Sequence, residues 1–308
     1  MVRRRLTIAA LGIVALFALL LAPLAIAPGP VTHALEDAAH VPLFGVVAAV
    51  AYWVFGAIAN LRLAGEGARF ALAFACAAGL GLATELAQAL GPRDASWADL
   101  RSDVLGAGAA LGLVAAYRMR ARTRPSRAAL VVAALVAASL ALLPLWTQLA
   151  AARERATQWP VLLDGSSRYA GLNVERHAAQ WDRASTYWRL QFFSGQWPGV
   201  YFYGLKSDWR GYRALVLELE NPTRQPVPIS LSLRDRGHGK TYDDRFNASS
   251  VIAPGSRALL RFALADIAAA PQQRQLRLDD VASLTLFRGG EPDRESGGEI
   301  RVYSIRLE

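Results

Sequence analysis

The sequence predicts a two-part protein, an all-α bundle of membrane-spanning helices followed by an all-β jelly-roll sandwich. The first half of the 308 residues is nearly saturated with Ala, Leu, Val and Gly. The second half has ordinary polarity, is rich in aromatic residues and repeats its apolar residues with a period of two, which is typical of strands. We expect a helical transmembrane domain at 1–150, a linker at 151–158 and an extracytoplasmic sandwich at 159–308.

Five apolar segments predict transmembrane helices, because each is near the ~20 residues that cross a bilayer. They run over 6–27, 39–59, 68–90, 103–118 and 128–149, and the fourth is short. The first segment also has features of a signal peptide, although Pro28 after Ala25-Ile26-Ala27 should hinder cleavage. Pro144 predicts a kink in the fifth helix.

Arginine clusters give the expected orientation in the membrane. Arg3, Arg4 and Arg5 precede the first segment, and five arginines lie within 118–127, from the end of the fourth segment to the start of the fifth. Basic loops stay in the cytoplasm, so we expect a multi-pass protein of the bacterial inner (cell) membrane. Its N-terminus should be cytoplasmic and its C-terminal domain periplasmic or otherwise extracytoplasmic. Because arginines at the ends of spans supply much of the net charge of +9, the lipid bilayer is an expected partner and nucleic acid is not.

A cluster of polar residues is expected at the outer ends of the second, third and fourth spans. Ionisable side chains at membrane depth are costly and rare, so their presence there indicates a functional site. Glu36, His40 and Phe44 recur every four residues and share one helix face, with Asp37 one step aside. The candidate residues are Glu36, Asp37, His40, Glu85, Gln88, Arg93, Asp99 and Asp103.

Three chemical roles are open to this cluster. Glu85, with His40 and Asp103, could act as a general acid or base, and Arg93 could bind a phosphate or carboxylate. The carboxylates could also hold a hard divalent cation; otherwise we expect no cofactor and no resident metal.

A purely structural role is the alternative. Glu85 and Gln88 would then be polar contacts between helices, Asp99 a helix cap and Arg93 a neutralising charge.

Several of these residues form a spaced pattern. Glu85-x-x-Gln88 is followed by Leu90, Arg93, Ser96, Asp99, Asp103 and Gly106, and it is preceded by Glu36, His40 and Phe44. Over about residues 30–118 this pattern resembles the VanZ-like family, which implies a small polytopic protein of the bacterial envelope whose polar outer-face residues belong together. The chain departs from the family at Glu36, Leu90 and Asp103. The family's association with glycopeptide resistance does not transfer to this chain.

Segments of period two predict seven strands in the second half. They are Trp188–Phe193, Val200–Leu205, Ala214–Leu219, Val227–Arg234, Ala258–Phe262, Ala282–Phe287 and Arg301–Leu307. Turn signals rich in glycine, asparagine and proline separate them, which favours an antiparallel sandwich or jelly roll. The Trp209–Leu215 segment and the closing strand resemble those of galactose-binding, carbohydrate-binding-module jelly rolls.

Aromatic residues are concentrated in this half and could stack on sugar rings. Trp188 and Trp209 are expected in the sandwich core. Trp197, in the turn Ser194–Gly199, is the candidate for an exposed ligand contact. Acidic pairs at Asp243, Asp244, Asp279 and Asp280 could hold calcium, with solvated turns as the alternative.

The combined pattern favours an envelope protein that binds a lipid head group or an envelope glycan precursor at the polar cluster and carries a carbohydrate-binding-like outer domain. The alternative is a membrane enzyme that modifies a lipid-linked or phosphorylated envelope precursor with Glu85, His40 and Asp103. Transport is disfavoured because five spans show no inverted repeat. The oligomeric state is not predicted.

Overall fold

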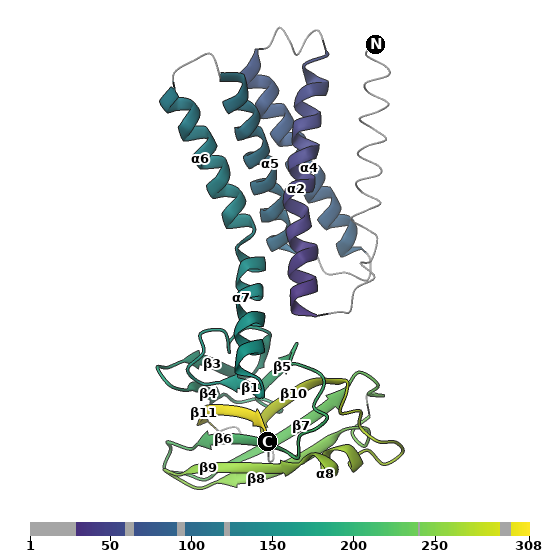
Figure 1. The fold of residues 1–308 in the computed structure, drawn as a ribbon, viewed down its shortest axis with the longest axis vertical. Helices are drawn as coiled ribbons and strands as arrows, with labels where there is room; N and C mark the ends of the chain where they lie inside the picture. The colour runs from purple at the N-terminus through teal and green to yellow at the C-terminus, as the bar shows by residue number, and fades with distance from the viewer. Residues whose placement is uncertain (1–28, 59–64, 91–95, 120–123, 240, 290–296) are drawn as a thin grey trace. The chain divides into compact units, whose positions relative to one another are not determined.

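The computed structural model describes residues 29–58, 65–90, 96–119, 124–239, 241–289 and 297–308. The chain divides into two compact units, 1–149 and 150–308, and each is described by itself (Figure 1). The predicted first span, 6–27, and Arg93 lie outside the described residues.

The first unit is helical. Its helices are α2 (Pro30–Phe55), α4 (Glu66–Ala89), α5 (Trp97–Arg118) and α6 (Arg124–Ala141), and α7 (Leu143–Gln158) begins at its end. Small residues dominate where helices meet: Ala48, Ala73, Ala77 and Ala107 are fully buried beside Val47. Side chains of this size let helix backbones approach closely, which is how helices associate without a hydrophobic driving force in lipid.

Glycine makes the contact between α2 and α5 especially close. A Cβ atom on Gly106 would lie 2.3 Å from the carbonyl oxygen of Val41 and 2.8 Å from its Cα. On the facing helix, a Cβ on Gly45 would lie 3.3 Å from the Gly106 carbonyl oxygen. The backbones therefore touch at a place where any side chain on Gly106 would push them apart.

The expectation of five spans is only partly met. Among the described residues, two helices are long and apolar enough to cross a membrane, Pro30–Phe55 and Glu66–Ala89. A third span is counted if the helices Pro125–Ala141 and Leu143–Gln158, bent by 53° at a short break, act as one. Pro144 lies just after this break.

The predicted span 103–118 does not qualify, and this corrects the prediction. Its helix α5 begins earlier than expected, at Trp97, and carries Asp99, Arg101 and Asp103 in its first two turns and Arg118 in its last. Charged groups in these numbers make the segment too polar to be counted as a span by composition.

The second unit is an antiparallel β-sandwich, which confirms the predicted order of a helical part followed by such a fold. One sheet has the order β3-β4-β11-β6-β9, with β1 added on β11; the other has the order β2-β5-β10-β7-β8. The strands of the first sheet are β1 (Val161–Asp164), β3 (Ala179–Arg183), β4 (Trp188–Phe192), β6 (Ala214–Glu220), β9 (Arg257–Ala263) and β11 (Gly298–Leu307). Those of the second are β2 (Val174–His177), β5 (Gly199–Tyr203), β7 (Val227–Asp235), β8 (Phe246–Ile252) and β10 (Val281–Arg288).

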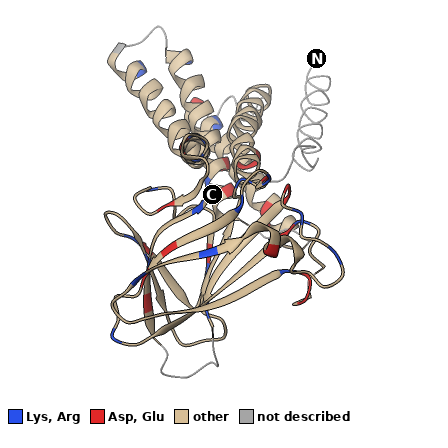
Figure 2. Cartoon of the chain, turned by 60° about the horizontal axis from the view of Figure 1, so that its bottom comes forward, with Lys and Arg blue, Asp and Glu red and all other residues tan. Residues whose placement is uncertain are grey.

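The core lies between the two sheets. Leu190, Leu217, Leu233 and Leu284 are fully buried there with Trp209, as period-two strands with one inward face require. A short helix, α8 (Leu264–Ala269), follows β9 and adds Leu264 and Ile267 to this core. Charged residues are sparse along the helices of the first unit and frequent on the strands and loops of the sandwich (Figure 2).

The close contact between α2 and α5 gives a direct test of the helical packing. We expect Gly106→Ala to lower the thermal unfolding midpoint of the detergent-solubilised protein, at a cost of about 2 kcal/mol, because the new Cβ would overlap the Val41 backbone. Gly79→Ala is the matched control, since a Cβ there meets nothing within 4 Å. Equal midpoints for the two variants would contradict the packing described here.

Candidate functional site

Two helices bring a histidine and an aspartate together in the first unit. His40 Nδ1 on α2 lies 2.8 Å from Asp103 Oδ1 on α5. Asp103 is only 1% exposed, and the His40 ring is stacked on Phe44 with 6.1 Å between ring centroids. The packing of Phe44 and the carboxylate together fix the imidazole, so that its Nδ1 faces the acid.

Glu85 on α4 is the second buried acid of this cluster. Its side chain is 4% exposed, and Oε2 accepts a hydrogen bond from the backbone N–H of Ser96 at 2.7 Å. Among the described residues, neither Glu85 Oε1 nor Asp103 Oδ2 has a hydrogen-bond partner. A Cβ on Gly81 would lie 2.7 Å from Asp103 Oδ2, so glycine makes the room for this carboxylate.

The remaining predicted residues surround this centre unevenly. Asp99 lies within electrostatic range of both His40 and Asp103, and Asp37 lies within range of His40 and Asp99. Glu36 instead pairs with His33 at 3.4 Å.

Gln88 is half-buried, and Arg93 lies outside the described residues. The residue that caps the N-terminus of α5 is Ser96, whose hydroxyl oxygen accepts a hydrogen bond from the backbone N–H of Asp99 at 3.3 Å. The suggested capping role of Asp99 is therefore wrong.

No metal site is formed within the described part of the chain, where no three His, Cys, Asp or Glu side chains converge as ligands. Three of the acids considered for calcium bind arginine instead. Asp244 pairs with Arg274, and Asp279 and Asp280 pair with Arg277.

The β-sandwich carries a groove of about 500 Å³ on the outer face of its second sheet. Strands β7, β8 and β10 form its floor, and Trp197, from the turn before β5, forms part of its wall. Its lining residues are Trp197, Ser230, Leu231, Ser232, Arg234, Tyr242, Arg245, Asn247, Ala248, Ser249, Thr285, Phe287 and Gly289.

Strand register explains why polar residues line the floor. Ser232 on β7 lies opposite Asn247 on β8 and Thr285 on β10, and Ser230 lies two residues away on the same face. The residues that alternate with them, Ile229, Leu231 and Leu233, belong to the hydrophobic core. The alternation of side chains along a strand thus gives one apolar face and one polar face.

Four buried polar atoms of the groove have no hydrogen-bond partner among the described residues. They are Ser232 Oγ, Asn247 Oδ1, Arg234 Nε and Arg245 Nε. Buried polar atoms are almost always paired in folded proteins, because an unmade hydrogen bond costs about 1–3 kcal/mol. Their concentration in one groove indicates that a polar ligand or solvent completes their bonds.

Trp197 presents a flat apolar surface at the groove. It is 62% exposed, as its turn predicts, and its ring meets Phe287 edge-on with 5.8 Å between centroids. The residue has a φ of 53°, in the left-handed region, which is uncommon outside glycine and costs free energy. The turn therefore holds the indole outward at an energetic cost.

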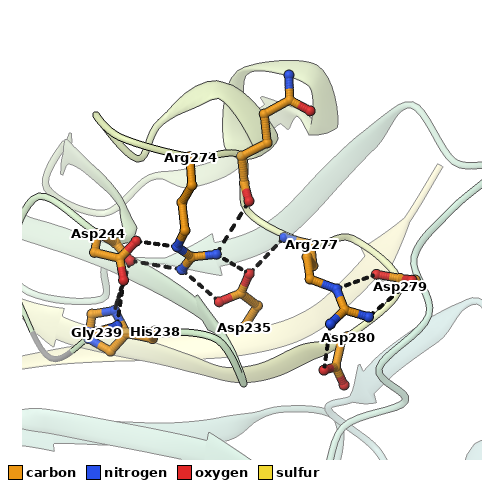
Figure 3. Close-up of polar contacts among 9 residues, drawn as sticks. Asp235, His238, Gly239, Asp244, Arg274, Arg277, Asp279 and Asp280 are labelled. Atoms are coloured by element: carbon orange, nitrogen blue, oxygen red, sulfur yellow. Dashed lines mark hydrogen bonds and ion pairs between the residues drawn. The ribbon is translucent and has the colours of Figure 1, made fainter.

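An ion-pair network fixes the loop between β7 and β8 (Figure 3). Asp235, 2% exposed at the end of β7, accepts hydrogen bonds from Arg274 Nη1 at 2.5 Å, Arg274 Nη2 at 2.8 Å and the backbone N–H of Arg277 at 2.7 Å. Arg274 Nε also donates to Asp244, which in turn accepts from Gly239 N–H. This clamp of Asp235, Arg274 and Asp244 holds both ends of the loop that carries Tyr242, and Arg245 follows directly.

Sequence reasoning found Trp197 but missed the rest of the groove. Ser230, Ser232 and Arg234 were visible as the polar positions of an alternating strand. Tyr242, Arg245 and Asn247 lie in a segment for which no strand was predicted, and their partners on β7 follow only from the register.

Comparisons with known proteins add the following. No family model and no curated protein matches the chain. The sandwich is similar to several solved structures. One is the family 11 carbohydrate-binding module from Clostridium thermocellum in complex with a β-1,3-1,4-mixed-linked tetrasaccharide. The two sequences are 11% identical, the TM-score is 0.37, and the match covers 48% of this chain and 94% of that one. A family 29 carbohydrate-binding module from Piromyces equi has 12% identity and a TM-score of 0.33, covering 48% and 87%.

PfGH50B has 16% identity and a TM-score of 0.38, and the match covers 47% of this chain but only 23% of that protein. The chain thus spans under a quarter of its length. With TM-scores below 0.5, the choice of a ligand rests on the geometry of the groove.

The clamp predicts a specific loss of stability. Arg274→Ala leaves the buried Asp235 carboxylate without its guanidinium, and we expect the free energy of unfolding to fall by about 3 kcal/mol. Arg277→Ala removes the same charge from a largely exposed side chain and should cost less than about 1 kcal/mol. Denaturant unfolding of the full chain, followed by tryptophan fluorescence, measures both; equal losses would contradict the role given to Arg274.

The same clamp predicts a pH dependence. Burial, the largest influence, raises the pKa of Asp235, but hydrogen bonds from Arg274 and from the Arg277 backbone lower it to a net value below 3.8. A lowered carboxyl pKa contributes stability that is complete above the unfolded value and is lost as pH falls through the folded value. We therefore expect the stability difference between wild type and Arg274→Ala to shrink below pH 3.8; a constant difference would refute this coupling.

Proposed function

We propose that this protein is a membrane-anchored carbohydrate-binding protein of the bacterial envelope, whose sandwich binds a glycan in the groove on β7, β8 and β10. The observation that carries this proposal is the combination of an exposed tryptophan with four buried polar atoms that have no partner among the described residues, all in one groove. The apolar helices of the first unit support the anchoring part.

A sugar has the surface that this groove fits. One side of a pyranose ring presents C–H groups that pack on an aromatic face, while its hydroxyl groups donate and accept hydrogen bonds around the rim. Trp197 supplies the aromatic face, and Ser232, Asn247 and Thr285 supply alternating donors and acceptors across three strands. Binding sites commonly combine apolar walls with a few placed polar groups in this way.

The groove's volume sets the size of ligand. About 500 Å³ falls within the range of ~300–1,000 Å³ usual for small-molecule sites, which suits a short stretch of an oligosaccharide rather than a whole polymer chain.

Trp197→Ala tests the carbohydrate function. We expect the full-length variant to bind its best glycan at least about tenfold more weakly, equivalent to ~1.4 kcal/mol, because the stacking surface is lost. Phe193→Ala is the control, since Phe193 is also exposed but does not line the groove. Binding to an immobilised panel of neutral and acidic oligosaccharides measures this, and unchanged binding by Trp197→Ala would remove the groove from the proposal.

A second candidate function concerns the polar cluster of the first unit. The observation that favours it is the buried group of His40, Asp103 and Glu85, in which two carboxylate oxygens have no described partner. Such a group could bind the polar head of a lipid-linked precursor, or transfer a proton during its modification, with Asp103 orienting His40. Asp37, Asp99, Glu36, Gln88 and Arg93 would add contacts to the head group.

Glu85→Gln separates this second function from a packing role, because glutamine keeps the size and the ability to accept from Ser96 N–H but loses the ionisable oxygen. We expect a lipid-linked precursor to accumulate in cells that carry Glu85→Gln at wild-type expression, measured by mass spectrometry of lipid extracts. Glu66→Gln, at the other end of α4, is the control. Identical lipid profiles for Glu85→Gln and wild type would exclude both handling and chemistry at this acid.

A further inference from the structure

Two arginines lie side by side at one end of the groove. The register between β7 and β8 pairs Ser232 with Asn247 and Leu233 with Phe246. Arg234 directly follows Leu233, and Arg245 directly precedes Phe246, so both come next after the last pair of this ladder. Both line the groove, and Arg234 is among the groups that act electrostatically on Arg245.

Neither arginine has an acidic partner among the described residues, although many arginines of the sandwich do have one. Nine of these pair with an Asp or Glu: Arg189, Arg210, Arg236, Arg257, Arg261, Arg274, Arg277, Arg301 and Arg306. No described carboxylate forms an ion pair with Arg234 or Arg245, and in each the Nε atom is buried without a described partner. Burying a charged hydrogen-bond donor without a partner costs free energy, and here two positively charged groups have such a donor.

Acids close to these arginines in the sequence or on the same sheet form no ion pair with them. Asp244 precedes Arg245, but its carboxylate binds Arg274 and Gly239 in the clamp. Glu175 is on the same sheet, but it lies opposite Tyr201 on β5, beyond β10, and does not line the groove. Every described lining residue is neutral except the two arginines.

The electrostatic influences on Arg245 are those of a positive charge without an acidic partner. Burial first, and Arg234 second, lower the pKa of Arg245, while Tyr242 raises it. The guanidinium lies over the Tyr242 ring, 4.9 Å from its centroid. An arginine stays charged even so, and two such charges near each other strongly favour an anion between them.

We infer that the groove binds an acidic carbohydrate, a glycan with a carboxylate or sulfate group that lies between the guanidinium groups of Arg234 and Arg245. Guanidinium forks bind carboxylate and sulfate oxygens in paired, charge-assisted hydrogen bonds. The sugar ring would stack on Trp197 while Ser232 and Asn247 bind its hydroxyl groups. This inference rests on the proposed carbohydrate-binding function and adds the charge of the ligand.

The test compares glycans that differ only in charge. Full-length protein, in a detergent without a sugar head group, is titrated with galacturonic acid oligosaccharides and their methyl esters, and with sulfated and desulfated agaro-oligosaccharides. Where a pair binds, we expect the affinity for its charged member to be at least about tenfold higher than the affinity for its neutral member. This comparison uses only wild type, so it does not depend on whether a variant folds.

Variants then locate the charge recognition. Arg234→Gln and Arg245→Gln should each remove most of the preference for the charged member while binding of the neutral member persists. Arg224→Gln, which removes an exposed arginine outside the groove, should leave the preference intact. An equal loss in Arg224→Gln would mean that the net charge of the protein attracts the polyanion, and would overturn the inference.

The remaining outcomes separate the inference from the function on which it rests. Equal affinity of wild type for charged and neutral members overturns the inference and leaves carbohydrate binding intact. Binding to no glycan of either kind overturns both. Inorganic sulfate that binds as tightly as the sulfated oligosaccharide, and competes with it, would identify an anion site without sugar recognition and also overturn the inference.

Discussion

The alternation of side chains along β7 ties the core, the groove and the clamp to one strand of nine residues. Its odd-numbered residues Ile229, Leu231 and Leu233 enter the sandwich core, while Ser230, Ser232 and Arg234 form the groove floor. Asp235 is the last residue on the inward face of the strand, and its carboxylate accepts a hydrogen bond from Arg274. Because the period of a strand is two, a shift of one residue would turn the serines toward the core and the leucines toward the groove. Burial of the leucines therefore fixes the register that assembles the groove.

The helical unit depends on a comparable constraint of a different kind. His40 and Asp103 lie on different helices, and they meet because Gly45 and Gly106 let the backbones of α2 and α5 touch. Gly81 on α4 leaves the space that the Asp103 carboxylate occupies. The small residues and the polar cluster are thus parts of one arrangement, since larger side chains at these positions would separate the acids and the histidine.

Local patterns could be predicted from the sequence, and pairings over long distances could not. The seven strands with clear alternation were predicted, as was the exposed turn of Trp197. The missed strands are short and polar, such as Val174–His177, or have a weak apolar alternation, such as Phe246–Ile252. Missing β8 hid Arg245 and Asn247, because their positions follow only from pairing with β7. In the helices, clustering of His40, Glu85 and Asp103 was expected from topology, but the cap of α5 is Ser96 and not Asp99, which the structural alternative had named.

Two arginines at the β7–β8 loop have opposite roles, and the contrast explains how structure and binding are kept separate. Arg274 forms ion pairs with both Asp235 and Asp244, so its charge is neutralised and stabilises the loop. Arg245 follows Asp244 directly, so the clamp also limits where its backbone can go, and its guanidinium lies over the Tyr242 ring. A loop that is already held in place lowers the entropy cost of ordering it on binding. An unneutralised pair of guanidinium groups, placed by a neutralised one, therefore gives the groove both its attraction for an anion and its preorganisation.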